Sequence, residues 1–237
     1  MSHIPRVRAT VAVAIREPGW SEAKGQRVRA STGGGAVDGA DRDVRDGLES
    51  GRMDGTTLRT PRLSLRQVGD GDVDRILEYR NLPEVTYWLL RTEVEPAAFR
   101  AAWRRAADDP DDHSRAVVLD GLVIGTVSLD VLDGMGQPGM PTRTEAQLGY
   151  IFDPAHGGRG YATEAVTAMV GYAFTRLGVR RITAGCFADN LASVRVLEKV
   201  GMRREQHGVG DSWHAERGWV DGYTYALCAD AWPAPPR

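Results

Sequence analysis

A glycine-rich segment joined to an amphipathic helix constrains this fold more than any other feature. Residues 152–165 read Phe-Asp-Pro-Ala-His-Gly-Gly-Arg-Gly-Tyr-Ala-Thr-Glu-Ala. Apolar residues then recur at the i, i+3, i+4, i+7 spacing of a helix as far as residue 177, and Gly178 follows as a C-cap. Because small residues leave the N–H groups at the start of such a helix uncovered, the segment predicts a phosphate-binding loop.

The spacing of these glycines excludes two familiar phosphate-binding motifs. A P-loop requires a lysine after its last glycine, and a dinucleotide-binding fold requires Gly-x-Gly-x-x-Gly after its first strand. Residues 157–162 read instead Gly-Gly-Arg-Gly-Tyr-Ala. A glycine-rich turn alone is weak evidence, since glycine also serves ordinary tight turns.

The flanking segments supply more evidence. Residues 145–152 have the composition of a strand that ends at Pro154, and residues 181–186 alternate like a half-buried strand. A short helix follows, for which Asp189 is the predicted N-cap and Gly201 the C′ residue.

These motifs resemble those of one family. The run Gly157–Ala162 resembles the Gln/Arg-x-x-Gly-x-Gly/Ala motif of the GNAT superfamily of acetyl-CoA-dependent N-acetyltransferases, although Gly157 replaces the Gln or Arg. Residues 189–202 are similar to the Asn-x-x-Ser…Glu-Lys-x-Gly-Phe signature of its ribosomal-protein N-acetyltransferase (Rim-type) branch, and residues 58–66 look like the first strand of that branch. The resemblance covers roughly residues 57–232.

The resemblance and the local patterns imply an α+β fold, a GNAT-like mixed, twisted central sheet with helices on both faces. We expect helices at 72–80 and 96–107, a loop at 133–143, and strands at 62–68, 116–120, 122–129 and 219–227. The Asp120-Gly121 dipeptide predicts a hairpin turn, and Asp221-Gly222 predicts another turn at the final strand.

The chain divides into three parts by composition. Residues 1–57 are rich in glycine and charge and are expected to be a disordered extension, or an arm that docks on the domain or a partner. Residues 58–232 form the expected acetyltransferase domain, and 233–237 a C-terminal tail. A further hypothesis is that translation starts at Met53, which mass spectrometry of peptides upstream of Met53 would disprove.

The composition limits the classes of partner and cofactor that we expect. The net charge of −2 gives no basic field for nucleic acid or an anionic membrane. No segment is typical of a signal peptide or membrane span, so we expect a cytoplasmic protein, monomeric or homodimeric. Cys186 and Cys228 are expected as core residues, and the five histidines form no metal-ligating cluster, so no metal is expected.

The resemblance assigns cofactor contacts. It implies that the backbone of the central strand at residues 150–152 pairs with the pantetheine arm of acetyl-CoA, and that one strand amide polarises the thioester carbonyl. The loop and helix start bind the pyrophosphate, and the short helix contributes Asn190 and Ser193. The cofactor-binding residues are therefore Tyr150, Ile151, Phe152, Gly158, Arg159, Gly160, Tyr161, Ala162, Thr163, Asn190 and Ser193.

The resemblance also indicates candidate catalytic residues. Ser193 is the candidate acid for the leaving thiolate, because the tyrosine that many superfamily members use corresponds here to Leu197. The relatives carry a glutamate as base where this chain has Gln147, and an amide cannot take a proton. Glu145, two residues earlier on the same strand face, is an alternative base acting through water, or else a charge at the edge of the sheet.

The acceptor is expected to be a primary amine, attacked directly in a ternary complex without a covalent enzyme intermediate. A lysine amine is about 0.04% neutral at pH 7, whereas an α-amine is about 10–15% neutral, so a poor base favours a peptide N-terminus or a small-molecule amine. Candidate acceptor-site residues are Tyr87, Trp88, Trp219 and Tyr223. Two alternatives stay open: a degenerate member that binds acyl-CoA as a sensor or scaffold, and an antibiotic-modifying acetyltransferase.

Overall fold

The computed structural model describes residues 57–232. Met53, the extension apart from its last residue, and the tail 233–237 lie outside the described residues. The described strands form one eight-stranded sheet in the order β1-β2-β3-β4-β5-β6-β8-β7. They are β1 (Leu58–Arg59), β2 (Ser64–Arg66), β3 (Arg115–Leu119), β4 (Leu122–Leu132), β5 (Glu145–Phe152), β6 (Arg181–Phe187), β7 (Arg203–His214) and β8 (Gly218–Cys228).

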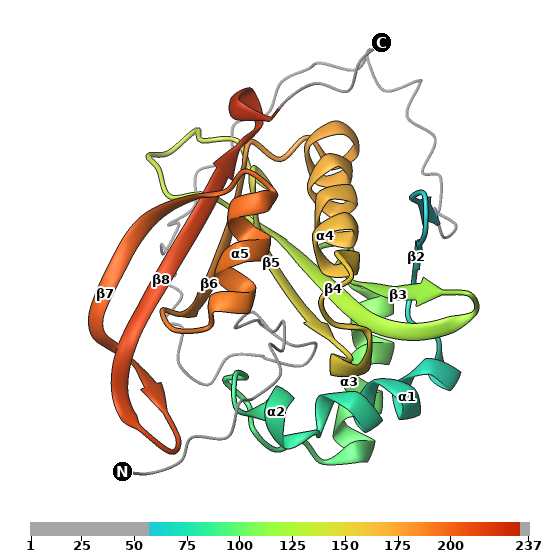
Figure 1. The fold of residues 1–237 in the computed structure, drawn as a ribbon. Coiled ribbons are helices and arrows are strands. Elements are labelled where there is room, and N and C mark those ends of the chain that lie inside the picture. Colours follow the sequence, from blue (N-terminus) through green and yellow to red (C-terminus); the bar gives the residue numbers. More distant parts are fainter. Residues whose placement is uncertain (1–56, 233–237) are drawn as a thin grey trace, which may run out of the picture.

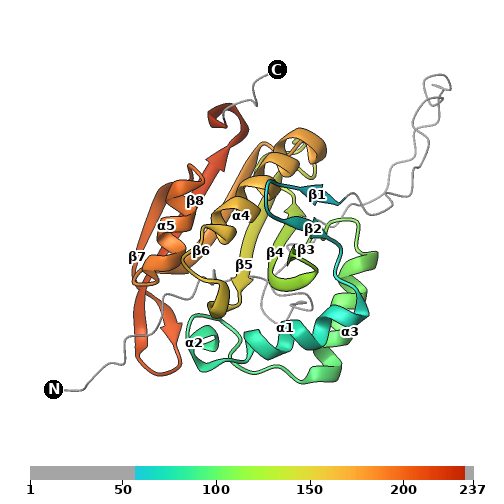
Figure 2. The same ribbon diagram turned by 45° about the vertical axis from the view of Figure 1, so that its right-hand side comes forward.

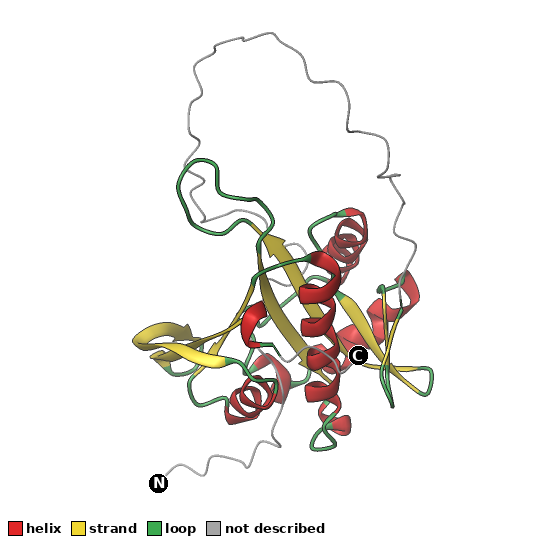
Figure 3. Cartoon of the chain, turned by 90° about the horizontal axis from the view of Figure 1, so that it is seen from above, coloured by secondary structure: helices red, strands yellow, loops and turns green. Residues whose placement is uncertain are grey.

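Helices cover both faces of this sheet (Figure 1, Figure 3). On one face lie α4 (Tyr161–Tyr172) and α5 (Leu191–Lys199), and on the other lie α1 (Val73–Arg80), α2 (Pro83–Thr86) and α3 (Pro96–Asp108). The expected α+β fold, a mixed and twisted sheet between two layers of helices, is confirmed.

Strand alternation divides the apolar residues between two cores. On β4 and β5, Val127, Leu129 and Leu148 face the core beneath α4 and α5. Ile151 faces the opposite way and joins the core beneath α1–α3. The β3–β4 hairpin turns at Asp120 and Gly121 as expected, with both residues at positive φ, which fits the twist of a two-residue hairpin.

The sheet opens between β5 and β6. All neighbouring strands are antiparallel except β5 and β6, whose parallel pairing joins only residues 145–147 to residues 181–183. Strand β5 pairs with β4 along the whole length of β5, up to Phe152. One edge of residues 148–152 is therefore left outside the ladder, beneath α4 and α5 (Figure 2).

Several predicted boundaries are corrected. The strand predicted at residues 62–68 is shorter, since β2 spans only Ser64–Arg66, and β1 pairs with β2 as a small hairpin. The final strand does not turn at Asp221-Gly222, because β8 runs straight through this dipeptide and the chain turns at residues 215–217. Gly222 instead lies opposite a bulge of β7, where a Cβ would come within 2.4 Å of Ser212 Oγ.

The helices also differ in detail from the prediction. Helix α4 begins at Tyr161 and passes into a π-helical turn, Ala173–Leu177, before Gly178 ends it at φ 69°. The N-cap of α5 is Asn190, not Asp189, because the Asn190 side-chain oxygen accepts a hydrogen bond from Ser193 N at 3.2 Å. Asp189 forms an ion pair with Arg217 instead.

Candidate functional site

The glycine-rich loop is anchored at its start by Asp153 and reaches α4 through two glycines. At its start, Asp153 accepts a hydrogen bond from Ala155 N at 2.8 Å and forms an ion pair with Arg75 of α1. Further on, Gly158 and Gly160 lie at φ 74° and 80°, a left-handed conformation that side chains with a Cβ rarely adopt. The loop therefore needs glycine at both positions to reach the start of α4.

The N-terminus of α4 presents backbone donors. Gly160 is its N-cap and supplies no side-chain hydrogen bond, and the first helical hydrogen bond runs from Glu164 N to Gly160 O at 3.0 Å. The N–H groups of Tyr161, Ala162 and Thr163 precede that bond, so they lie outside the helical ladder. Together with the helix dipole, they make this end suitable for an anion.

A cavity of about 230 Å³ lies beside these donors. It runs between the loop and α5, and its lining residues are Phe152, His156, Gly157, Gly158, Gly160, Tyr161, Ala162, Thr163, Ala192, Arg195, Val196 and Lys199. Six of the predicted cofactor residues therefore line it: Phe152, Gly158, Gly160, Tyr161, Ala162 and Thr163. Arg195 and Lys199, which the sequence pattern did not indicate, are two exposed cations one helical turn apart on α5, and they face the same space as the glycine-rich loop.

An ion pair between Arg62 and Glu164, which are distant in the sequence, holds the start of α4. Arg62 donates to Arg159 O at 2.9 Å and to Glu164 Oε2 at 2.6 Å, and its guanidinium lies 4.6 Å from the centre of the Tyr161 ring. Thr60 Oγ1 donates to the other Glu164 oxygen at 2.6 Å. We call this set of contacts the Arg62 clamp. Arg62 and Thr60 link the first β-hairpin to the glycine-rich loop and to the first turn of α4.

The first turn of α5 is buried against the open part of the sheet. Asn190 and Ser193 are 1% and 0% exposed, and Tyr150 Oη donates to Ser193 O at 3.2 Å. Burial raises the pKa of Tyr150 well above its usual value, and it raises the pKa of the nearby Cys186 thiol to about 12. Cys186 therefore stays protonated near neutral pH and is a poor nucleophile.

The candidate base Glu145, and Gln147 at the position where the relatives carry their base, lie where β5 and β6 are still paired. Glu145 Oε1 accepts from Arg180 at 2.7 Å, so this carboxylate already holds an ion pair at the start of β5. Gln147 lies at the last β5–β6 pair, opposite Thr183. A base at Glu145 stays a prediction, and the ion pair with Arg180 counts against it because it already neutralises this carboxylate.

Only two of the four predicted acceptor-site residues, Tyr87 and Trp88, lie together. Tyr87 and Trp88 pack edge to face at 4.8 Å, and the His214 ring lies 4.5 Å from Tyr87. His214 Nε2 lies 2.9 Å from Tyr87 O, which ties the end of α2 to the β7–β8 hairpin, and Arg217 lies over both predicted rings. This aromatic cluster borders the α1–α3 side of the sheet.

The other two predicted residues lie elsewhere. Tyr223 is opposite Cys186 on β6 and packs against the core beneath α4 and α5. Trp219 is 67% exposed and packs against Trp213 at the end of the hairpin, at 5.4 Å between ring centres. The structure therefore does not place Trp219 or Tyr223 with Tyr87 and Trp88.

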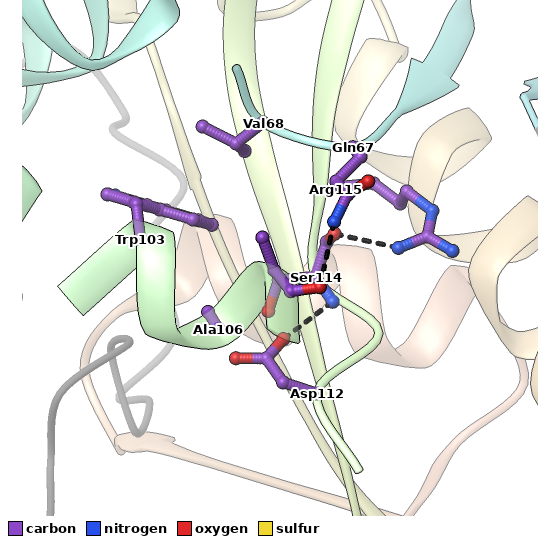
Figure 4. A pocket seen from close by; sticks show the side chains of 8 residues that line it. Gln67, Val68, Trp103, Ala106, Asp112, Ser114 and Arg115 are labelled. Carbon is purple, nitrogen blue, oxygen red and sulfur yellow. Dashed lines mark hydrogen bonds between the residues drawn. The ribbon is translucent and has the colours of Figure 1, made fainter. Parts of the chain in front are cut away.

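A second cavity is too small for a cofactor. It measures about 10 Å³, which is the room of one water molecule, and lies between α3 and β3 (Figure 4). Asp112, Ser114 and Trp103 line it, and the Asp112 carboxylate accepts from Ser114 N at 2.8 Å. Within residues 57–232, no group of His, Cys, Asp and Glu could hold a metal, and no helix is long and apolar enough to cross a membrane.

Comparisons with known proteins agree with this geometry. The family described as Acetyltransferase (GNAT) domain matches residues 62–203. Protein p20 of Bacillus licheniformis, an uncharacterised N-acetyltransferase, is 28% identical over 178 residues, which cover 72% of this chain and 95% of p20. The chain spans about half the length of two other curated N-acetyltransferases from Bacillus subtilis, with 50% and 44% of each matched.

Solved structures share the fold. An acetyltransferase of the GNAT family from Bacillus anthracis superposes with a TM-score of 0.62 at 26% identity, over 73% of this chain and 99% of that one. RimL, a ribosomal L7/L12 alpha-N-protein acetyltransferase in complex with coenzyme A, superposes with a TM-score of 0.64 at 17% identity, over 74% and 99% of the two chains.

Proposed function

We propose that this chain, which belongs to the GNAT family of acetyltransferases, transfers the acetyl group of acetyl-CoA directly to a primary amine, with a peptide α-amine as the acceptor. One observation carries the proposal. The cavity beside the α4 N-terminus reaches Phe152, the last residue of the part of β5 that has no β6 partner, so a phosphate site and an unpaired strand edge adjoin. This is the combination that a long thioester with a phosphorylated end requires.

Each part of the site has a role in this proposal. The N–H groups at the start of α4 bind the pyrophosphate of acetyl-CoA, and Arg195 and Lys199 bind its remaining phosphate charge. The free edge of residues 148–152 hydrogen-bonds the pantetheine arm, and one of its amides polarises the thioester carbonyl. Ser193, in the first turn of α5, is the proposed proton donor to the departing thiolate.

The acceptor class rests on two supports. A direct attack needs no enzyme nucleophile, and Cys186, the cysteine nearest the open part of the sheet, has a raised pKa. The α-amine is preferred because a larger fraction of it is neutral near pH 7 than of a lysine side chain. RimL, which shares the fold, is described as an alpha-N-protein acetyltransferase.

Titration calorimetry of the full chain with acetyl-CoA tests the cofactor site. Gly160→Asp places a carboxylate where the pyrophosphate is expected. Because two unit charges about 4 Å apart repel by about 4 kcal/mol near a protein surface, binding should weaken about 100-fold or more. Gly139→Asp is the matched control, since Gly139 also has a positive φ of 92° and open space around it but lies in the loop after β4.

A second pair of variants tests the cations. Arg195→Ala with Lys199→Ala should weaken acetyl-CoA binding about tenfold or more, whereas Arg176→Ala, an exposed cation just after α4 and outside the cavity, should not. Equal affinity of wild type, Gly160→Asp and the double variant would refute the cofactor site. Release of free thiol in the presence of peptide α-amines then tests the reaction itself.

A further inference from the structure

A row of polar side chains crosses the sheet at the point where β5 and β6 part. On β4, Asp130 lies directly opposite Gln147 of β5, and Gln147 lies opposite Thr183 of β6. All three residues are half-buried. Residues directly opposite each other in a sheet point to the same face, so the three side chains form one continuous strip.

The strip faces away from α4 and α5. Its neighbours along each strand lie in the core beneath those two helices: Leu129, Val131, Ala146, Leu148, Ile182 and Ala184. Alternation then turns the strip to the opposite face, the one bordered by the cluster of Tyr87, Trp88 and His214. The strip therefore shares a face of the sheet with Tyr87 and Trp88, two of the predicted acceptor-site residues.

Asp130 supplies a carboxylate at this point, and Gln147 does not. Directly opposite residues of an antiparallel pair have Cβ atoms about 4.5–5.5 Å apart. A carboxylate on Asp130 can therefore reach the same space as a carboxylate at position 147 would. The register, and not the sequence spacing, brings these two residues together.

Two further carboxylates in or beside this row serve as comparisons for Asp130. Glu145, two residues before Gln147 on β5, accepts from Arg180 at 2.7 Å. Asp112, the neighbour of Asp130 on its other side, accepts from Ser114 N beside the small cavity at α3 (Figure 4). Burial raises the pKa of Asp112, although its hydrogen bonds with Ser114 act in the opposite direction.

We propose that Asp130 binds the ammonium group of the acceptor and accepts its proton, so that it replaces the missing carboxylate at Gln147. This inference rests on the proposed function. The carboxylate takes one proton from R–NH₃⁺ and leaves a neutral amine, whose lone pair forms the C–N bond with the thioester carbon. The C–S bond then breaks with its electron pair on sulfur, the nitrogen loses a second proton, and the thiolate gains one. The products are the N-acetyl amide, CoA–SH and one proton released to water.

The test uses the full chain, acetyl-CoA and a library of tripeptide amides that covers every N-terminal residue. Free thiol is measured against pH for wild type, Asp130→Asn, and Asp130→Asn combined with Gln147→Glu. We expect Asp130→Asn to lower kcat about 100-fold or more and to remove the decline of the rate at acid pH, because loss of a general base has effects of this size. Gln147→Glu in the same chain should restore a large part of the rate and the acid limb.

Two further variants separate a catalytic role from loss of structure. Asp112→Asn makes the same change of charge in the same row, on the side away from Gln147, and should leave the rate and its pH profile close to wild type. Glu145→Gln tests the competing base. Acetyl-CoA affinity, measured by calorimetry for every variant, should stay unchanged.

The outcomes are distinct. If wild type binds acetyl-CoA but releases no thiol with any peptide, the proposed acceptor class fails, and the inference fails with it. If wild type is active and Asp130→Asn is equally active, or Glu145→Gln shows the loss instead, the inference alone is overturned. Rescue by Gln147→Glu supports it, since a merely structural role of Asp130 would not be restored from the opposite strand.

Discussion

Removal of the Arg62 clamp should weaken acetyl-CoA binding as well as stability. Arg62→Ala deletes an ion pair with Glu164, a hydrogen bond to Arg159 O and a contact with the Tyr161 ring. Arg62 is 44% exposed, so the ion pair contributes at most about 1 kcal/mol, and the cation–π contact contributes about 0.5–1 kcal/mol. Because such terms overlap, we expect a loss of about 1–2 kcal/mol in the free energy of unfolding.

The effect on binding follows from charge. Arg62 Nη2 would lie 3.5 Å from a Cβ placed on Gly160, so its charge is within about 8 Å of the proposed pyrophosphate. At that distance the interaction is about 0.5–2 kcal/mol for effective dielectric constants of about 80 to 20. Arg62→Ala also leaves the Glu164 carboxylate unneutralised beside the phosphates. We therefore expect an affinity about fivefold weaker, measured by calorimetry.

A matched ion pair on the next strand serves as the control. Arg66 pairs with Asp72, and the two side chains are 39% and 13% exposed, close to the 44% and 15% of Arg62 and Glu164. Arg66→Ala should therefore cost similar stability in thermal denaturation without weakening acetyl-CoA binding. Equal losses of affinity in both variants would refute the reasoning, because the effect would then be one of general stability.

Glu164→Gln should separate charge from geometry, since it loosens the clamp but removes a negative charge near the phosphates. Its affinity for acetyl-CoA should be equal to or tighter than that of wild type. The pH dependence follows the same carboxylate: burial opposes its ionisation, but hydrogen bonds from Thr60 and Arg62 outweigh burial and lower the pKa of Glu164. The stability it contributes is complete above the unfolded pKa and is lost as pH falls through the lower folded one, a loss that Glu164→Gln should not show.

Two further predictions concern the β7–β8 hairpin. Burial, and then the charge of Arg217, lower the pKa of His214, and its Nδ1 accepts a hydrogen bond from Glu216 N that protonation must break. The free energy of unfolding should therefore decrease as the pH drops below about 6.5. In denaturant titrations, His214→Gln should lose this part of the pH dependence. Gly222→Ala should destabilise the protein by about 1–3 kcal/mol, because its Cβ would lie 2.4 Å from Ser212 Oγ. In thermal denaturation, the double variant Gly222→Ala with Ser212→Gly should regain part of the lost stability. A Gly222→Ala variant as stable as wild type would contradict the close packing.

The parts of the fold that the sequence predicts are those with local causes. The central strand ends just before Asp153-Pro154, the glycine-rich loop depends on glycines at positive φ, and the β3–β4 turn depends on Asp120-Gly121. In each case the decisive residues are neighbours in the chain. The GNAT resemblance and the α+β fold, drawn from such motifs, are confirmed.

The parts that were missed have causes distant in the sequence. Strand β7 is exposed along most of its length, so no alternation of apolar residues marks it. The Asp221-Gly222 dipeptide is a turn signal by itself, but here Gly222 accommodates the bulge of β7 across the ladder. Asp189 and Asn190 are both good N-caps, and only the structure shows that Asn190 binds Ser193 N.

The same limit applies to the site. The glycine-rich loop is continuous in sequence, so the sequence predicts it. By sequence alone, Arg195 and Lys199 are ordinary cations on the surface of a helix, and only the structure shows that they line the cavity. Arg62 reaches Arg159 O across 97 positions of the chain. Asp130 lies in an apolar strand, and only the β4–β5 register places it opposite Gln147.

The short seam between β5 and β6 has a mechanical consequence. Three residue pairs join the part of the sheet formed by β1–β5 to the part formed by β6, β8 and β7. A pantetheine arm that hydrogen-bonds the free edge of β5 would act as a further strand wedged into the gap. Loading the donor would then stiffen the whole sheet, so that the protein resists unfolding and amide exchange more strongly with acetyl-CoA in place, and release of CoA would return the gap to its looser state.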